Sequence, residues 1–255
     1  MAPPPKPTFT LTRAVRGAPY APFLSAFHDS AALAACQDAA GDMEGLCVSG
    51  WVPDLDALLS SAPVPGPPGP PTARPPPTTT APSYRRMQFS PVINEPWLPK
   101  LSMFQVTEIH TLEPRADAHA PLRMTGVARL RWASFAKPSH VLDSAIEARP
   151  VEWVDGEGEG EPTPGVLLTF SVTPHLPPWA IGPLKKLVLA GIADMFSDFA
   201  QRSLAWAVAG VGAELVEDAP EIEQAVDVAS AIPSGELGEA SASPGEGGQA
   251  AAGEP

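Results

Sequence analysis

Cysteine is scarce in this chain of 255 residues, and its two cysteines exclude the usual cysteine-based structures. Cys36 and Cys47 lie eleven residues apart, with no second cysteine pair and no nearby histidine to complete a zinc site. A disulfide framework needs more cysteines than this. We therefore expect two free thiols in a reducing compartment, and a cytoplasmic location.

Long apolar runs and an apolar leader are also missing. The N-terminal sequence Met-Ala-Pro-Pro-Pro-Lys-Pro has no hydrophobic core of the kind that marks a secretory signal. The longest apolar runs fall far short of the roughly 20 residues that a membrane-spanning helix needs. We expect no transmembrane segment.

Positive charge is absent from the C-terminal part of the chain. No Lys or Arg follows Arg202, whereas ten acidic residues do, from Glu214 to Glu254. The formal net charge is −13, although the part before this tail holds 19 acidic and 16 basic residues. Because no basic stripe is present and the tail repels phosphates, we expect no nucleic-acid partner.

The familiar catalytic and cofactor motifs do not occur either. The chain has no GxSxG, P-loop, HExxH, GxGxxG or Cys-x-x-Cys motif, and no two histidines have the i, i+4 spacing of a helical metal site. We therefore predict no catalytic centre, no metal and no cofactor. The five histidines are spread over separate predicted elements: His28, His110, His119, His140 and His175.

Proline and glycine are abundant, with 34 and 21 residues, and they are concentrated in low-complexity segments. We predict disorder in a leader at 1–7, a Pro-rich insertion at 62–82 and an acidic tail at 216–255. The remainder, 8–215, is predicted to form one domain interrupted by the insertion.

The N-terminal part predicts a strand followed by two helices. Residues 8–15 alternate between apolar and polar side chains, as a half-buried strand does. Pro19 suits the first turn of a helix, because its missing N–H would be unpaired there. Asp29 is a candidate N-cap for a second helix that carries Leu33.

The middle of the chain predicts an antiparallel meander. In 122–135 the apolar residues fall on one face and arginines and threonines on the other, so one face is packed and one is solvated. Residues 43–59 favour a strand near Leu46 followed by a short helix near Leu58. The further strands are predicted at 84–92, 101–112, 141–153 and 166–172.

Residues 179–210 form the longest helical pattern. A helical projection places one broad apolar arc opposite Asp194 and Asp198, so this helix is predicted to lie on the sheet. The predicted arc contains Leu184, Val188, Leu189, Ile192, Met195, Phe196, Phe199 and Trp206.

This order of elements resembles the START, polyketide cyclase and Bet v 1-like superfamily. The opening from Phe9 to Asp29, FTLTRAVRGAPYAPFLSAFHD, resembles the first strand and helix of that family, and 175–210 resemble its closing helix. The resemblance covers roughly 8–36 and 84–210. The Pro-rich insertion departs from the family, which passes directly into its next strand.

The resemblance implies an α+β helix-grip fold, in which a curved antiparallel sheet wraps around a long C-terminal helix. It also implies a cavity between sheet and helix that holds a lipid, sterol, polyprenyl compound or similar ligand. The candidate ligand-binding residues are Phe104, Val106, His110, Met124, Leu130, Trp132, Leu142, Phe170, Ile192, Met195, Phe199 and Arg202.

Two polar positions have alternative interpretations. Glu108 and His110 share a strand face with Phe104 and Val106 and are candidates for a ligand head-group site or for acid–base work, with His140 as a looser third candidate. A bulge that turns them to solvent is the interpretation we favour. Arg202 is a candidate partner for a ligand carboxylate or phosphate, although an arginine that extends past the sheet edge is favoured.

We therefore predict a non-catalytic, monomeric carrier or sensor of a small apolar ligand. A cyclase-like enzyme and a protein-interaction module with a filled cavity are the alternatives. Transient contact with a membrane or another protein stays open.

Overall fold

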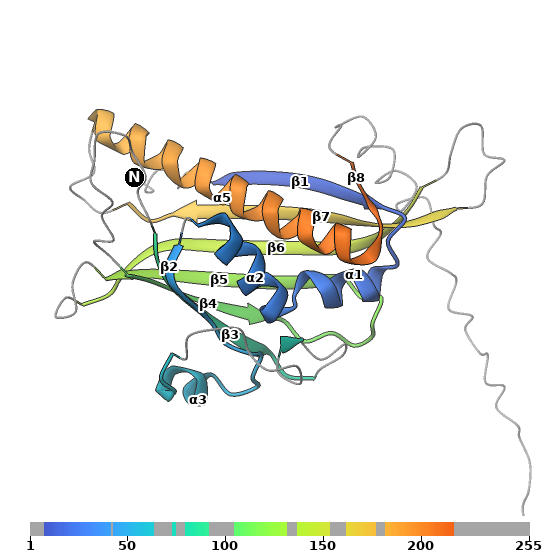
Figure 1. Cartoon of the computed structure of the whole chain (residues 1–255), viewed down its shortest axis with the longest axis horizontal. Helices are drawn as coiled ribbons and strands as arrows, with labels where there is room; N and C mark the ends of the chain where they lie inside the picture. The colour runs from blue at the N-terminus through green and yellow to red at the C-terminus, as the bar shows by residue number, and fades with distance from the viewer. Residues whose placement is uncertain are drawn as a thin grey trace, which may run out of the picture.

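One antiparallel sheet, covered on one face by helices, makes up the fold (Figure 1). The structure is a computed structural model, and it describes residues 8–41, 43–63, 73–74, 80–91, 105–131, 137–153, 162–176 and 182–216. The elements in chain order are β1 (Phe9–Arg16), α1 (Tyr20–Phe27), α2 (Ser30–Ala40), β2 (Met43–Val48), α3 (Leu55–Ser60), β3 (Ser83–Pro91), β4 (Gln105–Leu112), β5 (Leu122–Arg131), β6 (Ser139–Trp153), β7 (Thr163–Pro174), α5 (Gly182–Val211) and β8 (Glu214–Val216).

The sheet has eight strands in the order β2-β3-β4-β5-β6-β7-β1-β8. Strands β2 to β7 follow one another in sequence order, so the predicted meander is confirmed. Strand β1 continues the sheet beyond β7 by pairing with it along its whole length, from Phe9 opposite Val172 to Arg16 opposite Gly165, and β8 pairs with the other side of β1. The predicted α+β helix-grip arrangement is thereby confirmed.

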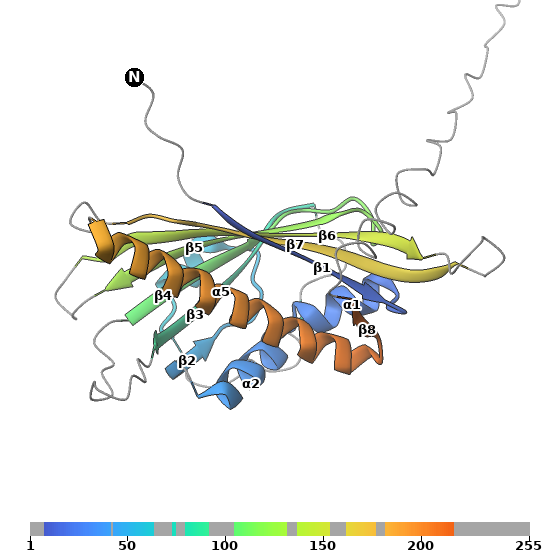
Figure 2. The same cartoon turned by 90° about the horizontal axis from the view of Figure 1, so that it is seen from above.

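The helix-covered face carries α1, α2 and α5, as the view along the sheet shows (Figure 2). Pro19 is the N-cap of α1, and Asp29 caps α2 by accepting hydrogen bonds from the backbone N–H groups of Ala31 and Ala32 at 2.8 and 3.1 Å. Both predicted helix starts are confirmed. The Tyr20 hydroxyl fixes α1 to the sheet because it accepts from the Leu122 N–H and donates to the Ala148 carbonyl.

Helix α5 packs on the sheet through part of the predicted apolar arc, which includes Phe196 and Phe199, and through buried residues that the arc omitted. Ala200, Leu204 and Ala207 are buried, and they recur at helical spacing. Met195 and Trp206, which the projection placed toward the sheet, are 45% and 48% exposed. The projection gave most weight to large side chains and therefore omitted the buried Ala200 and Ala207.

The opposite, outer face of the sheet holds α3. The predicted strand and short helix between residues 43 and 59 are both confirmed as β2 and α3, and Trp51 lies beyond the strand. Arg86 binds the end of α3, because its guanidinium donates to the carbonyls of Leu58 and Ser61 at 3.1 and 3.0 Å.

The predicted disordered segments lie largely outside the described residues. Within the Pro-rich insertion the structure places Ala73, which is buried, and Arg74, whose Nε donates to Asp29 at 3.0 Å. The leader at 1–7 and the tail beyond Val216 are not described, and Val216 itself is buried in β8. Among the described residues, no helix is long and apolar enough to cross a membrane.

Two substitutions on α5 test the corrected helix face. Leu204 is fully buried, so Leu204→Ala removes core packing and should lower the free energy of unfolding by roughly 2–5 kcal/mol. Trp206→Ala should cost under about 1 kcal/mol, although it removes the larger side chain, because half of that side chain is in solvent. Chemical denaturation measures both values, and a larger loss for Trp206→Ala would contradict the assignment.

Candidate functional site

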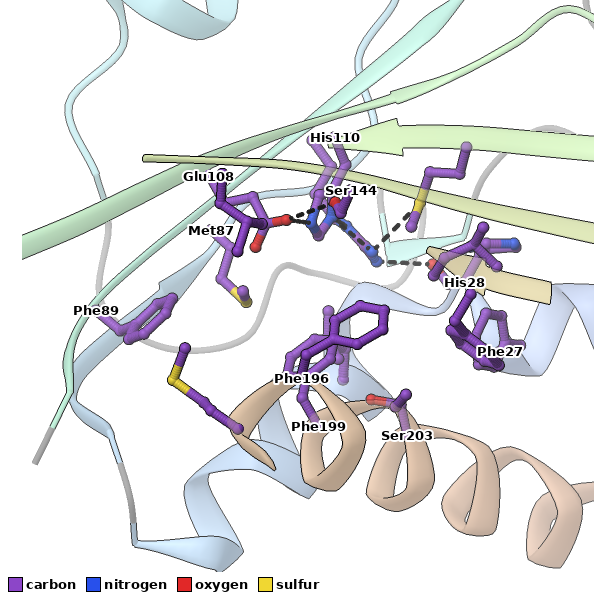
Figure 3. Close-up of a pocket in the computed structure, with 18 of the residues that line it drawn as sticks. Phe27, His28, Met87, Phe89, Glu108, His110, Ser144, Phe196, Phe199 and Ser203 are labelled. Atoms are coloured by element: carbon purple, nitrogen blue, oxygen red, sulfur yellow. Dashed lines mark hydrogen bonds and ion pairs between the residues drawn. The ribbon is translucent and has the colours of Figure 1, made fainter. Parts of the chain in front are cut away.

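A cavity of about 90 Å³ lies between the helix-covered face of the sheet and α5 (Figure 3). Strands β3 to β7 form its floor, and α5, α1 and α2 form its cover. The residues that line it are Phe27, His28, Leu33, Met43, Arg85, Met87, Phe89, Glu108, His110, Met124, Leu142, Ser144, Ile146, Phe170, Met195, Phe196, Phe199, Ala200 and Ser203.

Methionine and phenylalanine dominate the wall. Four of the chain's six methionines line the cavity, namely Met43, Met87, Met124 and Met195. Methionine side chains are unbranched and polarizable, so they adapt to occupants of different shape. The wall is therefore apolar and adjustable.

One polar row crosses the floor of this apolar cavity. The strand register sets Arg85 opposite His110, His110 opposite Gly126, and Gly126 opposite Ser144. These positions on β3, β4, β5 and β6 therefore lie side by side across the sheet. Glu108, two residues before His110 on the same strand, faces the same way (Figure 3).

Hydrogen bonds link the row into a chain of fixed direction. The Arg85 guanidinium lies 3.2 Å (Nε) and 3.0 Å (Nη2) from Nδ1 of His110, and Nε2 of His110 lies 3.1 Å from Oε1 of Glu108. Arginine only donates, so Nδ1 accepts and the imidazole proton sits on Nε2. His110 therefore links the Arg85 cation to the Glu108 carboxylate through hydrogen bonds. The Ser144 hydroxyl donates to the same Oε1 at 3.1 Å.

Gly126 is the residue that lets these groups meet. A Cβ at position 126 would lie 2.2 Å from Oγ of Ser144 and 2.7 Å from Oε1 of Glu108, which is closer than real contacts allow. A glycine inside a strand often marks such a close approach. The polar row thus depends on a missing side chain.

Arg85 is held in the core by several acceptors and one aromatic ring. It is only 2% exposed, and its Nη1 donates to the His28 carbonyl at 3.2 Å and to the Ser30 hydroxyl at 3.4 Å. Its guanidinium carbon lies 4.5 Å from the centre of the Trp51 ring. Burial lowers the pKa of Arg85 to about 10, against the opposing charges of Glu108 and Asp29, so the group stays protonated at neutral pH.

Glu108 presents a free acceptor to the cavity. Desolvation raises the pKa of Glu108, but the hydrogen bonds from His110 and Ser144 and the positive charge of Arg85 together hold it below its usual value. The carboxylate therefore stays ionised. Oε1 accepts from His110 and Ser144, whereas no donor among the described residues reaches Oε2.

His28 forms the cavity's end beside Phe27 and Trp51. Its ring packs edge-on against both aromatic rings, at 4.9 and 6.2 Å between centroids. Burial, followed by the charges of Arg85 and Arg115, holds the pKa of His28 well below 6.5, so the imidazole is neutral. Neither ring nitrogen has a hydrogen-bond partner in the described part of the chain.

The structure places half of the predicted ligand-binding residues in the cavity wall. The six that line it are His110, Met124, Leu142, Phe170, Met195 and Phe199. Glu108 also lines it, so the favoured outward orientation of Glu108 and His110 is wrong: β4 pairs without a bulge and keeps both side chains inside.

Four described candidates lie elsewhere. Val106 packs beside the cavity wall against the cluster around Phe89, and Leu130 lies across from it on β5. Ile192 and Arg202 are half-buried on α5 outside the lining. Phe104 and Trp132 lie outside the described residues.

The residues that sequence reasoning missed include the key cation of the site. Arg85 shares a strand face with Met87 and Phe89, and this alternation indicates an inward orientation. The lone Gly126 within a regular strand pattern was a second available signal. Ser144 and Ser203 carried no signal that separates them from ordinary strand and helix serines.

Comparisons with known proteins give a structural match only. No protein-family model matches the chain, and no curated protein does. Among solved structures, the crystal structure of Ara h 8.0201 matches with 12% sequence identity and a TM-score of 0.36, covering 80% of this chain and 99% of that chain.

The neutral, buried His28 makes stability depend on pH. Its folded pKa lies below 6.5, so below that pH the unfolded chain takes up a proton that the folded chain does not. The free energy of unfolding should therefore fall as the pH drops from 6.5 to 5, by up to about 1.4 kcal/mol per pH unit from this group.

His28→Phe keeps the aromatic packing and removes the titrating group. Denaturant unfolding of both proteins at several pH values isolates the contribution of His28, because the other histidines are common to both. We expect the wild-type curve to be steeper over this range. Parallel curves would show that His28 takes up a proton in the folded state as readily as in the unfolded one.

Proposed function

We propose that this chain binds a small apolar ligand carrying a hydrogen-bond donor, such as a hydroxyl group, in the cavity between the sheet and α5. One observation carries the proposal: an apolar, methionine-rich cavity contains an ionised carboxylate whose Oε2 has no donor in the described structure. The Glu108 side chain is only 13% exposed, so a ligand that supplies a donor to Oε2 would form a charge-assisted hydrogen bond with little competition from water and gain affinity.

The size of the cavity limits the occupant. At about 90 Å³ it is smaller than the roughly 300–1,000 Å³ of typical ligand pockets. Met195 lines the cavity and is also 45% exposed, so the cavity reaches the surface beside the N-terminal half of α5. Rotation of the methionine side chains enlarges the space without moving the strands.

The charges in the cavity favour a donor over an anion. The Arg85 donors are directed at His110, the His28 carbonyl and Ser30, so the cation is engaged within the protein. The acceptor left over belongs to Glu108. A ligand carboxylate would face a like charge there, whereas an alcohol donates to it.

A catalytic role has weaker support from the same geometry. Both nitrogens of His110 are engaged, Nδ1 by Arg85 and Nε2 by Glu108, so this imidazole has no nitrogen available for a substrate. Glu108 does reach the cavity, but a carboxylate with a lowered pKa is a weak general base. His140, the third acid–base candidate, lies on the outer face near Asp143. The carrier function is therefore preferred to the cyclase-like alternative.

Glu108→Gln tests the proposal by exchanging an acceptor for a donor. The amide oxygen must stay where His110 and Ser144 donate, so the amide NH2 replaces Oε2 in the cavity. A series of 1-alkanols should bind the variant several-fold more weakly, because the hydroxyl can then only accept from the neutral amide, and this bond is weaker than a bond donated to a carboxylate. Methyl ketones of the same length should bind it more tightly than they bind the wild type.

Titration calorimetry and tryptophan fluorescence measure these affinities. Glu113→Gln is the matched control, because Glu113 is an exposed carboxylate that pairs with Arg123 outside the cavity. We expect alkanols to bind the wild type and the control equally well, and better than carboxylates of the same chain length. Preferential binding of the carboxylates would refute the donor preference, and no binding of any member would refute the carrier function.

A further inference from the structure

A second cluster of polar side chains lies on the outer face of the sheet, away from the cavity. His140 and Asp143 belong to β6, and His175 follows directly after β7. Their side chains are 42%, 45% and 19% exposed. The ligand-type atoms of these three residues all lie within 4.8 Å of one another.

A bulge in β6 brings His140 and Asp143 together. In a regular strand, residues three apart point to opposite faces. Here Leu142 pairs with Ala128 and His140 pairs with Arg129, so Val141 is an extra residue on β6. The extra residue turns His140 to the outer face, where Asp143 already points.

The third member is fixed by the neighbouring strand. Asp143 pairs with Thr173 on β7, and the His175 N–H donates to the Val141 carbonyl at 2.7 Å. Backbone bonds thus hold His175 beside the bulge. Such rigidity favours binding, because little conformational entropy is lost when a ligand binds to a preformed site.

Both imidazoles direct the same type of nitrogen at one carboxylate. Nε2 of His140 lies 2.7 Å from Oδ1 of Asp143, and Nε2 of His175 binds Oδ2. The two rings are 4.0 Å apart between centroids, tilted by 31°.

We propose that His140, Asp143 and His175 bind a divalent transition-metal ion of the Zn²⁺ class. Two imidazole nitrogens and one carboxylate oxygen are ligands that such ions prefer over Mg²⁺ or Ca²⁺. The three atoms would move to roughly 3.3 Å from one another in a tetrahedral site. Each ring then carries its remaining proton on Nδ1 and offers Nε2 to the metal.

Space for further ligands of the ion adjoins the cluster. A shallow groove of about 280 Å³ begins at Asp143 and runs over Gly126. Hydroxyl side chains line it, from Thr125, Ser171 and Thr173. Three protein ligands leave a coordination position open, and water or a small polar molecule in the groove can fill it.

The metal site is independent of the proposed ligand cavity. Asp143 and Ser144 are adjacent on β6 and point to opposite faces of the sheet, so Asp143 serves the outer cluster and Ser144 the cavity. Failure of one proposal therefore leaves the other intact.

Titration of the full-length, reduced protein with Zn²⁺ by calorimetry, and with Co²⁺ by absorption spectroscopy, tests the proposal. We expect one ion per chain, a rise in melting temperature with Zn²⁺, and Co²⁺ bands without the intense sulfur-to-metal absorption that binding at Cys36 or Cys47 would produce. Mg²⁺ should not compete, which separates this site from the acidic tail.

Three variants and one control identify the ligands. His140→Ala, Asp143→Asn and His175→Ala should each weaken Zn²⁺ binding by at least about tenfold. His119→Ala is the matched control, because His119 is exposed in the connection between β4 and β5. The Zn²⁺ affinity of this variant should stay within about twofold of the wild-type value. His140 and Asp143 are substantially exposed, so their variants should keep the wild-type circular dichroism spectrum.

Three results would overturn the assignment. These are no one-to-one binding, unchanged affinity in His140→Ala and Asp143→Asn, or an equal loss in His119→Ala.

Discussion

The buried positive charge of Arg85 is the constraint on which the interior of this protein depends. An uncompensated cation in the core would cost several kcal/mol, so the fold must supply acceptors and a counter-charge. It does so with the His28 carbonyl, Ser30 and the imidazole of His110, which connects the cation to Glu108. These partners come from segments far apart in the chain, and the charge therefore ties α1, α2, β3 and β4 together.

Satisfying the arginine also determines what remains for a ligand. The guanidinium uses its donors on the protein, while the carboxylate at the other end of the chain of hydrogen bonds keeps one oxygen without a donor in the described structure. The cavity contains one cation and one anion. Only the anion, Glu108, has an atom available to a ligand, because Arg85 is engaged within the protein. The surrounding methionine and phenylalanine side chains set no direction of their own, so the orientation of an occupant falls to Glu108.

Periodicity alone predicted the order of elements, because each strand has one packed face and the helix starts carry Pro19 and Asp29. It failed where function depends on contacts between strands. Glu108 and His110 looked too polar for an inner face, and only the register that sets Arg85 opposite His110 explains their burial. The apolar arc of α5 was right for Phe196 and Phe199 and wrong for Trp206, and it omitted buried residues such as Ala200 because side-chain size dominated the projection.

The bulge at Val141 gives β6 an unusual evolutionary sensitivity. If Val141 were retained but the bulge were lost, Val141 would pair with Arg129 and His140 would turn to the helix-covered face, without a change in any side chain of the outer cluster. Relatives could therefore have both histidines and the aspartate and still lack the cluster. A comparison of such proteins has to establish the strand register, because one intervening residue keeps the two side chains on one face of a regular strand, whereas two intervening residues require the bulge.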